Sequence, residues 1–246
     1  MARVSVTEET WSSATSLRDF LPYTCGSKLD EFGRPFHSPT LDRKCRLIAL
    51  AALRSLWKHL SDSRCREAIE LTEQFADDLD ITKLRRAVVL AYAAWDESNV
   101  PDTDGFVEWS WDGSISEVVC RAVHEDEFDP DGPSQFIRLS WASILDEIQT
   151  FHIHRHEDAQ AFHFRLFHDI FGNPFRPVSV ERAWLTSAVV KLAEGMYESR
   201  DFGAMPILAD ALQDAGCDHA DILDHCRGDG PHTRGCWVVD LLLGKT

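Results

Sequence analysis

Apolar residues recur at intervals of three and four positions along most of this chain, and this period constrains its fold more than any other feature. Within residues 38–60, Leu47, Leu50 and Leu53 share one helix face, with Arg and Lys between them. The same period predicts further helices over residues 61–79, 81–98, 115–126, 134–171 (as one helix or two), 179–202, 205–216, 219–226 and 234–244. The predicted fold class is therefore all-α, a multi-helix bundle with little or no strand.

Polar and special residues mark where these helices begin and end. Ser61 or Asp62 is placed to cap the helix over 61–79. The helix over 205–216 has Pro206 in its first turn and Gly216 at its C-terminal end, the arrangement that helix termini favour. Three further residues are expected as N-caps of later helices: Ser179, Asp218 and Thr233.

Residues 99–133 break the helical pattern. They combine prolines with repeated Gly and Asp, and the alternation FVEWSW at 106–111 is typical of a short strand or hairpin arm. We therefore predict an N-terminal helical region (1–98), an acidic irregular linker or insertion (99–133) and a C-terminal helical region (134–246). One continuous domain is the alternative, since the length of 246 residues allows either.

The charge balance argues against two classes of partner. The formal net charge is −16, whereas nucleic acid and anionic lipid both attract basic surfaces. Between Asp96 and Asp131 acidic residues predominate, and Arg121 is the one Lys or Arg. This stretch is either a solvated acidic surface or a docking surface for a protein partner with a basic surface. We expect no nucleic acid and no membrane as partner.

The expected location is the cytoplasm. No apolar run reaches the roughly 18 residues of a membrane span, and the first residues lack the pattern of a secretory signal. The seven cysteines are an odd number without framework spacing, which is typical of reduced thiols.

Two short stretches, DTDG at 102–105 and DPDG at 129–132, resemble the start of a calcium-binding loop if their glycines are the sixth position of that loop. The twelfth position, six residues after the glycine, needs a bidentate Glu, but here it holds Trp111 and Arg138. The sequence therefore predicts no calcium site.

The stretch HCRGDGPHTRGCWVVD, residues 225–240, gathers Cys, His and Arg around a Gly-Pro turn. With one cysteine upstream it supplies candidate zinc ligands, and the H-x3-C step matches common ligand spacing, although no C-x-x-C pair is present. The candidate ligands are Cys217, His225, Cys226, His232 and Cys236. The alternative is that the thiols are small buried groups and the polar residues cap helices.

A second hypothesis makes Cys236 a nucleophile near the first turn of the last helix, where the helix dipole favours a thiolate. His232 would then be the base, with Asp240 or Asp224 as the residue that orients it. The short match to the Gly-Ser-Cys-Trp of papain-like peptidases does not extend further along the chain.

A third hypothesis is anion recognition by Arg227 and Arg234, whose guanidinium groups flank the glycines of the turn. The alternative is that both arginines form salt bridges with nearby aspartates. A separate group of histidines includes His152 and His156, four residues apart on a predicted helix. Because no third ligand accompanies them, we expect a polar helix flank.

The segments DEFGRPF (30–36) and DIFGNPF (169–175) match at five positions, which indicates either an old duplication or two local turns of the same kind. Residues 169–245, from DIFGNPFRP through HCRGDGPHTRGCWVVDLLLGK, resemble the C-terminal part of a paralogous family expanded in planctomycete bacteria. Residues 41–78, beginning LDRKCRL, resemble the opening segment of that family. The resemblance implies a bacterial, cytoplasmic protein from a many-copy set and implies no mechanism.

No motif in the chain joins a nucleophile, a base and an orienting group in one signature. The sequence therefore favours a non-enzymatic protein-interaction or regulatory module. The alternative function is zinc binding or a thiol-dependent enzyme, centred on the C-terminal Cys and His residues.

Overall fold

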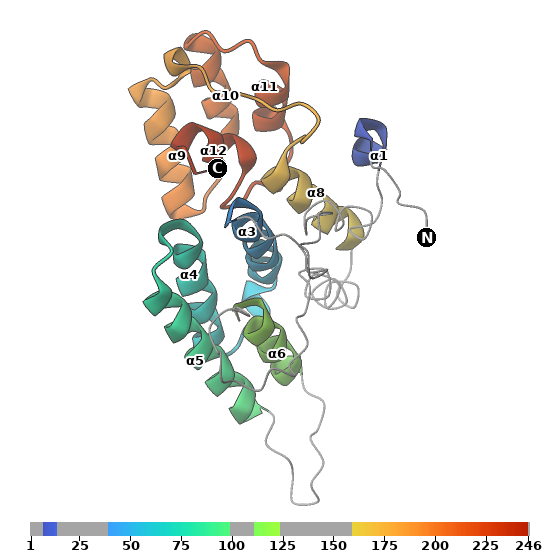
Figure 1. The fold of residues 1–246 in the computed structure, drawn as a ribbon, viewed down its shortest axis with the longest axis vertical. Helices are drawn as coiled ribbons and strands as arrows, with labels where there is room; N and C mark the ends of the chain where they lie inside the picture. Colours follow the sequence, from blue (N-terminus) through green and yellow to red (C-terminus); the bar gives the residue numbers. More distant parts are fainter. Residues whose placement is uncertain (1–6, 14–38, 99–110, 124–158, 246) are drawn as a thin grey trace, which may run out of the picture. The chain divides into compact units, whose positions relative to one another are not determined.

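The computed structural model describes residues 7–13, 39–98, 111–123 and 159–245 (Figure 1). These residues form helices joined by turns, with no strand among them, which confirms the predicted all-α class. The contacts between backbone positions divide the chain into two compact units. One unit is Leu21–Ala159, and the other joins Met1–Phe20 to Gln160–Thr246.

The described residues of the first unit form four α-helices: α3 (Pro39–Ser55), α4 (Ser63–Asp78), α5 (Ile81–Ser98) and α6 (Trp111–Val123). Helix α4 packs against the other three, and α6 also packs against α3 and α5. The apolar stripe predicted for α3 is buried, because Leu47, Leu50 and Leu53 are all inaccessible to solvent. A buried carboxylate, Glu73 of α4, is held by the Arg54 guanidinium of α3.

Asp62 caps α4, as the sequence predicts, because its side chain accepts a hydrogen bond from the Arg64 amide. Helix α6 confirms the helix expected within the irregular region, although it starts earlier and includes Trp111 of the FVEWSW stretch. The rest of that stretch lies outside the described residues, as do His152, His156 and the DEFGRPF segment.

The second unit contains α1 (Glu8–Ser13), nearly all of α8 (Ala159–Phe171) and four helices near the C-terminus. These four are α9 (Ser187–Ser199), α10 (Met205–Asp214), α11 (Ala220–Arg227) and α12 (Trp237–Leu243). Their apolar faces form one core, whose members include Val189, Met196, Leu208, Leu212, Ile222 and Val239. Among the described helices, none is long and apolar enough to cross a membrane.

Three predicted N-caps differ from those in the structure. Helix α9 begins at Ser187 and not near Ser179, because the Thr186 hydroxyl accepts a hydrogen bond from the Val189 amide at 3.3 Å. The N-cap of α11 is His219 in place of Asp218, and its side chain makes no capping bond. The N-cap of α12 is Cys236 and not Thr233, whose amide donates a hydrogen bond to Asp169 of α8.

Candidate metal centre

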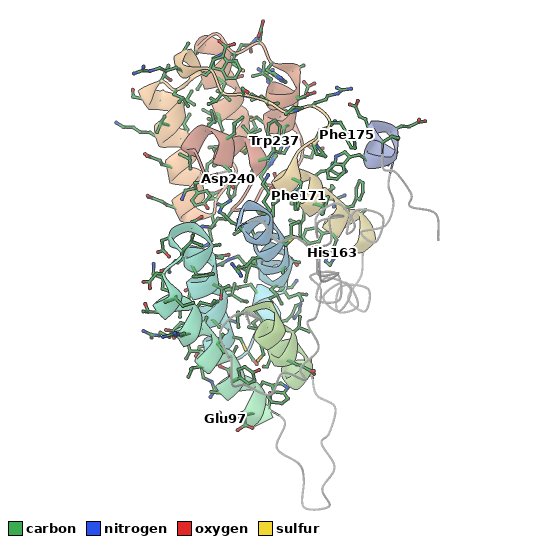
Figure 2. The ribbon with its side chains drawn as sticks, in the orientation of Figure 1. Glu97, His163, Phe171, Phe175, Trp237 and Asp240 are labelled. Atoms are coloured by element: carbon green, nitrogen blue, oxygen red, sulfur yellow. The ribbon has the colours of Figure 1, made fainter. Side chains whose placement is uncertain are left out.

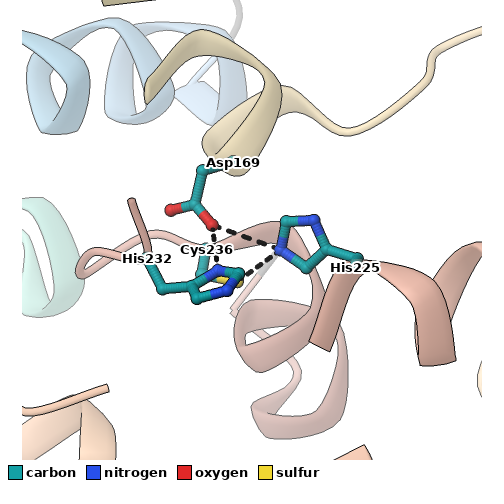
Figure 3. A group of neighbouring side chains, drawn as sticks. All are labelled: Asp169, His225, His232 and Cys236. Carbon is teal, nitrogen blue, oxygen red and sulfur yellow. Dashed lines mark hydrogen bonds and ion pairs between the residues drawn. The ribbon is translucent and has the colours of Figure 1, made fainter. Parts of the chain in front are cut away.

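Four side chains of the second unit converge on one point (Figure 3): Asp169, His225, His232 and Cys236. Asp169 comes from the last turn of α8 and His225 from α11, whereas the other two follow α11 in the turn that leads to α12. Each side chain contributes one ligand atom, and the four atoms lie within 4.8 Å of one another. Within the described part of the chain, this is the group of His, Cys and carboxylate side chains that could hold a metal ion.

The separations between these atoms match the needs of a small metal ion. Oδ1 of Asp169 lies 2.9 Å from Nδ1 of His232 and 3.2 Å from Nε2 of His225. The same nitrogen of His225 lies 3.2 Å from Sγ of Cys236. Donors around a tetrahedral zinc ion stand roughly 3 to 4 Å apart, since each lies about 2.0–2.3 Å from the metal. The residues present therefore fit zinc with little rearrangement.

The chain reaches this geometry through a tight turn between α11 and α12. Gly230 adopts a φ of +76°, a left-handed conformation that glycine tolerates best. A Cβ at this position would lie 2.9 Å from the backbone nitrogen of His232. Glycine at 230 thus lets the chain fold back and place His232 beside His225, whose rings meet edge to face at 4.9 Å.

Two neighbouring groups orient the candidate ligands. The second carboxylate oxygen of Asp169, Oδ2, accepts hydrogen bonds from the amide and the hydroxyl of Thr233, at 2.9 and 3.3 Å. The other ring nitrogen of His232, Nε2, lies 3.4 Å from the carbonyl oxygen of Gly228. Partners of this kind fix the orientation and tautomer of metal ligands. They leave Oδ1 of Asp169 and Nδ1 of His232 facing the centre.

Burial and hydrogen bonding shift the pKa values of this group in opposite directions. Burial alone would raise the pKa of Asp169, but hydrogen bonds with His225 and His232 outweigh it and lower that pKa. Burial alone would lower the pKa of His232, but the hydrogen bond with Asp169 outweighs it and raises that pKa. The carboxylate is thus ionised and supplies the negative charge that a metal cation needs.

The structure does not favour Cys236 as a nucleophile. Cys236 is fully buried, and burial together with the Asp169 carboxylate raises the pKa of its thiol well above the usual value. Both Asp169 and Cys236 approach the same nitrogen of His225. In a catalytic triad the acid and the nucleophile contact opposite nitrogens of the histidine, so His225 is not placed as the base of a triad, and the donor atoms instead converge on one point.

Of the five predicted zinc ligands, the structure brings together His225, His232 and Cys236. The other two, Cys217 and Cys226, lie in the hydrophobic core, and burial raises the pKa of Cys226 to about 12. Asp240 and Asp224, proposed from the sequence as orienting residues, are not in the group: Asp240 is buried in α12 (Figure 2) and Asp224 is exposed on α11.

The two arginines proposed for anion binding have separate partners. Arg227 pairs with Asp210 at 3.1 Å and donates to Gln213 at 2.8 Å, both on α10. The guanidinium of Arg234 stacks over the Tyr197 ring of α9, 4.6 Å from its centroid. The two guanidinium groups thus contact different helices, α10 and α9.

Asp169 is the candidate ligand that the sequence did not predict. It lies three residues after Leu166 and next to Ile170, both fully buried, so it occupies the apolar face of α8. A carboxylate on a buried helix face needs a partner, and this pattern could have marked it as a site residue. The partners themselves lie more than fifty positions away in the sequence, so local spacing could not identify them.

Asp169 also joins two parts of the unit. None of the buried residues of α8 belongs to the core formed by α9–α12. The end of α8 instead meets α12 where Gly172 approaches Trp237, whose ring would lie 3.0 Å from a Cβ at 172. Asp169 is the one member of the candidate centre that comes from α8, so a bound ion would tie this helix to the C-terminal core.

Comparisons with models of known protein families, with characterised proteins and with solved structures gave no match to this chain. The resemblance to the planctomycete family remains a prediction from the sequence.

Proposed function

We propose that this protein is a non-enzymatic interaction module whose C-terminal unit is held together by one structural zinc ion. The ligands are Oδ1 of Asp169, Nε2 of His225, Nδ1 of His232 and Sγ of Cys236. The observation that carries the proposal is the convergence of these four atoms within 4.8 Å, although they come from α8, from α11 and from the turn before α12.

The chemistry of the donors favours zinc over other biological metals. One thiolate, two imidazoles and one carboxylate form a borderline set that suits zinc, whereas magnesium and calcium prefer oxygen donors. A metal ion would also stabilise the thiolate of Cys236, offsetting the burial that keeps the thiol protonated.

A structural role follows from the number and burial of the ligands. Structural zinc sites have four protein donors, whereas catalytic sites keep one position for water or substrate. The side chains of Asp169, His232 and His225 are 2%, 9% and 18% exposed, and Cys236 is fully buried. The four donors would close the tetrahedron and leave no position for a reacting molecule.

The interaction role rests on the sequence. Between Asp96 and Asp131 the sequence has many acidic residues and one Lys or Arg, a charge balance that would attract a basic protein partner. The zinc centre lies in the other unit, where it would stabilise the fold.

Elemental analysis of the full chain, purified without chelator or a metal-binding tag, tests the zinc site. We expect one zinc per chain, with the metal lost in Cys236→Ser and His232→Ala. Matched controls are Cys226→Ser and His219→Ala, which change the same residue types outside the four-residue group and should retain zinc. Protein that folds without metal, or equal metal loss in the control variants, would contradict the proposal.

A further inference from the structure

One buried side chain of helix α1, Trp11, packs on α8 and on the turn that follows it. Trp11 is only 2% exposed, although the helix that carries it has six residues. Its ring meets Phe167 at 5.3 Å, His168 at 5.5 Å and Phe175 at 6.4 Å between centroids. The first two partners belong to α8, and Phe175 lies in the turn that follows it (Figure 2).

A polar contact fixes the direction in which α1 lies. Glu8, one helical turn before Trp11, forms an ion pair with Arg176. It also accepts a hydrogen bond from the Asn173 side chain at 3.3 Å. The other atom of that amide, Oδ1, accepts from the Phe175 amide at 2.9 Å, so the same residue shapes the turn and contacts α1. The surface therefore recognises a carboxylate and an indole at a fixed spacing.

This mode of attachment is typical of a bound peptide. A helix of six residues is not stable alone in water, so α1 is helical because it lies on α8. An amphipathic segment anchored by a large aromatic side chain is a common form of peptide recognition.

The packing of α1 allows it to be exchanged. No described residue of α1 belongs to the core formed by α9–α12, and its Trp11 packs on α8 and on the turn that follows it. The segment could therefore leave its site without opening that core.

We propose that the surface made by Phe167, His168, Phe175 and Arg176 is a recognition site for an acidic helical segment with Glu three residues before Trp. Helix α1 is its exchangeable occupant, and the α1 segment of a second copy of this chain fits the same site. This interaction surface is independent of the zinc proposal, since it uses none of the four candidate ligands.

Fluorescence anisotropy with a labelled peptide of residues 1–20 tests the site. The receptor is the full-length Trp11→Ala chain, whose own segment can no longer compete. We expect this chain to bind the peptide at least tenfold more tightly than a Trp11→Ala peptide. The wild-type chain should bind at least tenfold more weakly than the Trp11→Ala chain, because its own α1 is present at a high effective concentration. Equal binding of the two peptides, or equal binding by the two chains, would overturn the proposal.

A charge exchange separates recognition from any loss of folding in the Trp11→Ala chain. In the otherwise unchanged full-length protein, Glu8→Lys and Arg176→Glu should each loosen α1, and the double variant should restore its docking. The matching peptide experiment should show that an Arg176→Glu receptor prefers the Glu8→Lys peptide by about threefold, as for an exposed ion pair. If the double variant does not restore docking and the Arg176→Glu receptor does not prefer the Glu8→Lys peptide, the surface does not recognise α1 specifically.

Discussion

Thr233 controls which oxygen of Asp169 is available to a metal. Its amide and hydroxyl both contact Oδ2 of the carboxylate, so only Oδ1 faces the other ligands. We predict that Thr233→Val lowers zinc affinity by about tenfold, the lower end of the range for partners that orient metal ligands, because the amide contact remains. Thr233→Ser keeps the hydroxyl and should bind zinc as the wild type does. Competition with a chromophoric chelator measures both affinities, and equal affinities of the Val and Ser variants would count against this role.

Gly230 is the second residue on which the site depends. Alanine at 230 would combine a left-handed backbone with a Cβ 2.9 Å from the His232 nitrogen, so His232 must move. We predict that Gly230→Ala weakens zinc binding at least tenfold. Gly216→Ala is the matched control, since it has a φ of +90° and open space around its Cβ. Both variants should lose stability, but a control that loses as much zinc affinity as Gly230→Ala would contradict the prediction.

At the residue level the sequence predicted part of the site. Three of its five candidate ligands meet, because His225 and His232 flank a turn whose glycines and proline are visible in the sequence. Asp169 was missed because its partners are distant in sequence. The core positions of Cys217 and Cys226 depend on how α10 and α11 pack, which residue spacing does not specify.

The bounds of the helices agree closely with the sequence prediction where the residues at both helix ends give clear signals. Helix α10 has Pro206 in its first turn and Gly216 just after its end, at a φ of +90°. The start of α9 was misplaced because Ser179 and Thr186 are both good caps. Only the second is followed by a continuous helix, since a short 3-10 turn (Arg182–Trp184) and its buried Trp184 lie between them.

The cap of α4 gives a prediction on pH. The side chain of Arg64, and then its amide, hydrogen-bond the Asp62 carboxylate and lower its pKa despite some burial. A carboxyl whose pKa is lowered on folding stabilises the fold above its unfolded pKa, about 3.9, and this stabilisation is lost as pH falls through the folded value. We predict that Asp62→Ala lowers the free energy of unfolding by about 1 kcal/mol at pH 7.

Asp62→Asn keeps a capping oxygen and should cost less than the Ala variant. The difference between Asp and Asn should disappear when the pH falls well below 4, where the wild-type carboxyl is neutral. Urea unfolding at neutral and acid pH, followed by circular dichroism, measures these free energies. A difference that persists unchanged in acid would show that the charge of Asp62 does not contribute.

For the whole molecule, zinc should stabilise one unit and leave the other unchanged. The ligands all lie in the unit that joins Met1–Phe20 to Gln160–Thr246. Free zinc at 100 times its dissociation constant adds about 2.7 kcal/mol of stability, and a unit of this size gains roughly 10–20 °C in Tm. Calorimetry of the full chain with zinc and with a chelator should show one transition that moves and one that does not. A shift of both, or of neither, would contradict this assignment.

The division into units was the part of the organisation least visible in the sequence. The composition of residues 99–133 indicated a linker or an insertion, and α6 within this region packs against α3, α4 and α5. The association of α1 with α8 and the turn after it includes contacts of Trp11 and Glu8 with positions more than 150 residues away. Helical periodicity indicates which face of a helix is buried and does not indicate what covers it.

In our proposal Asp169, His225, His232 and Cys236 form one tetrahedral metal site. The absorption spectrum of the protein loaded with Co²⁺ in place of zinc tests this site, because cobalt reports both geometry and thiolate bonding. We predict intense visible bands of a tetrahedral ion and a thiolate-to-cobalt charge-transfer band, at one ion per chain. The charge-transfer band should vanish in Cys236→Ser and persist in Cys226→Ser. A weak octahedral spectrum, or a charge-transfer band that survives the loss of Cys236, would contradict the account.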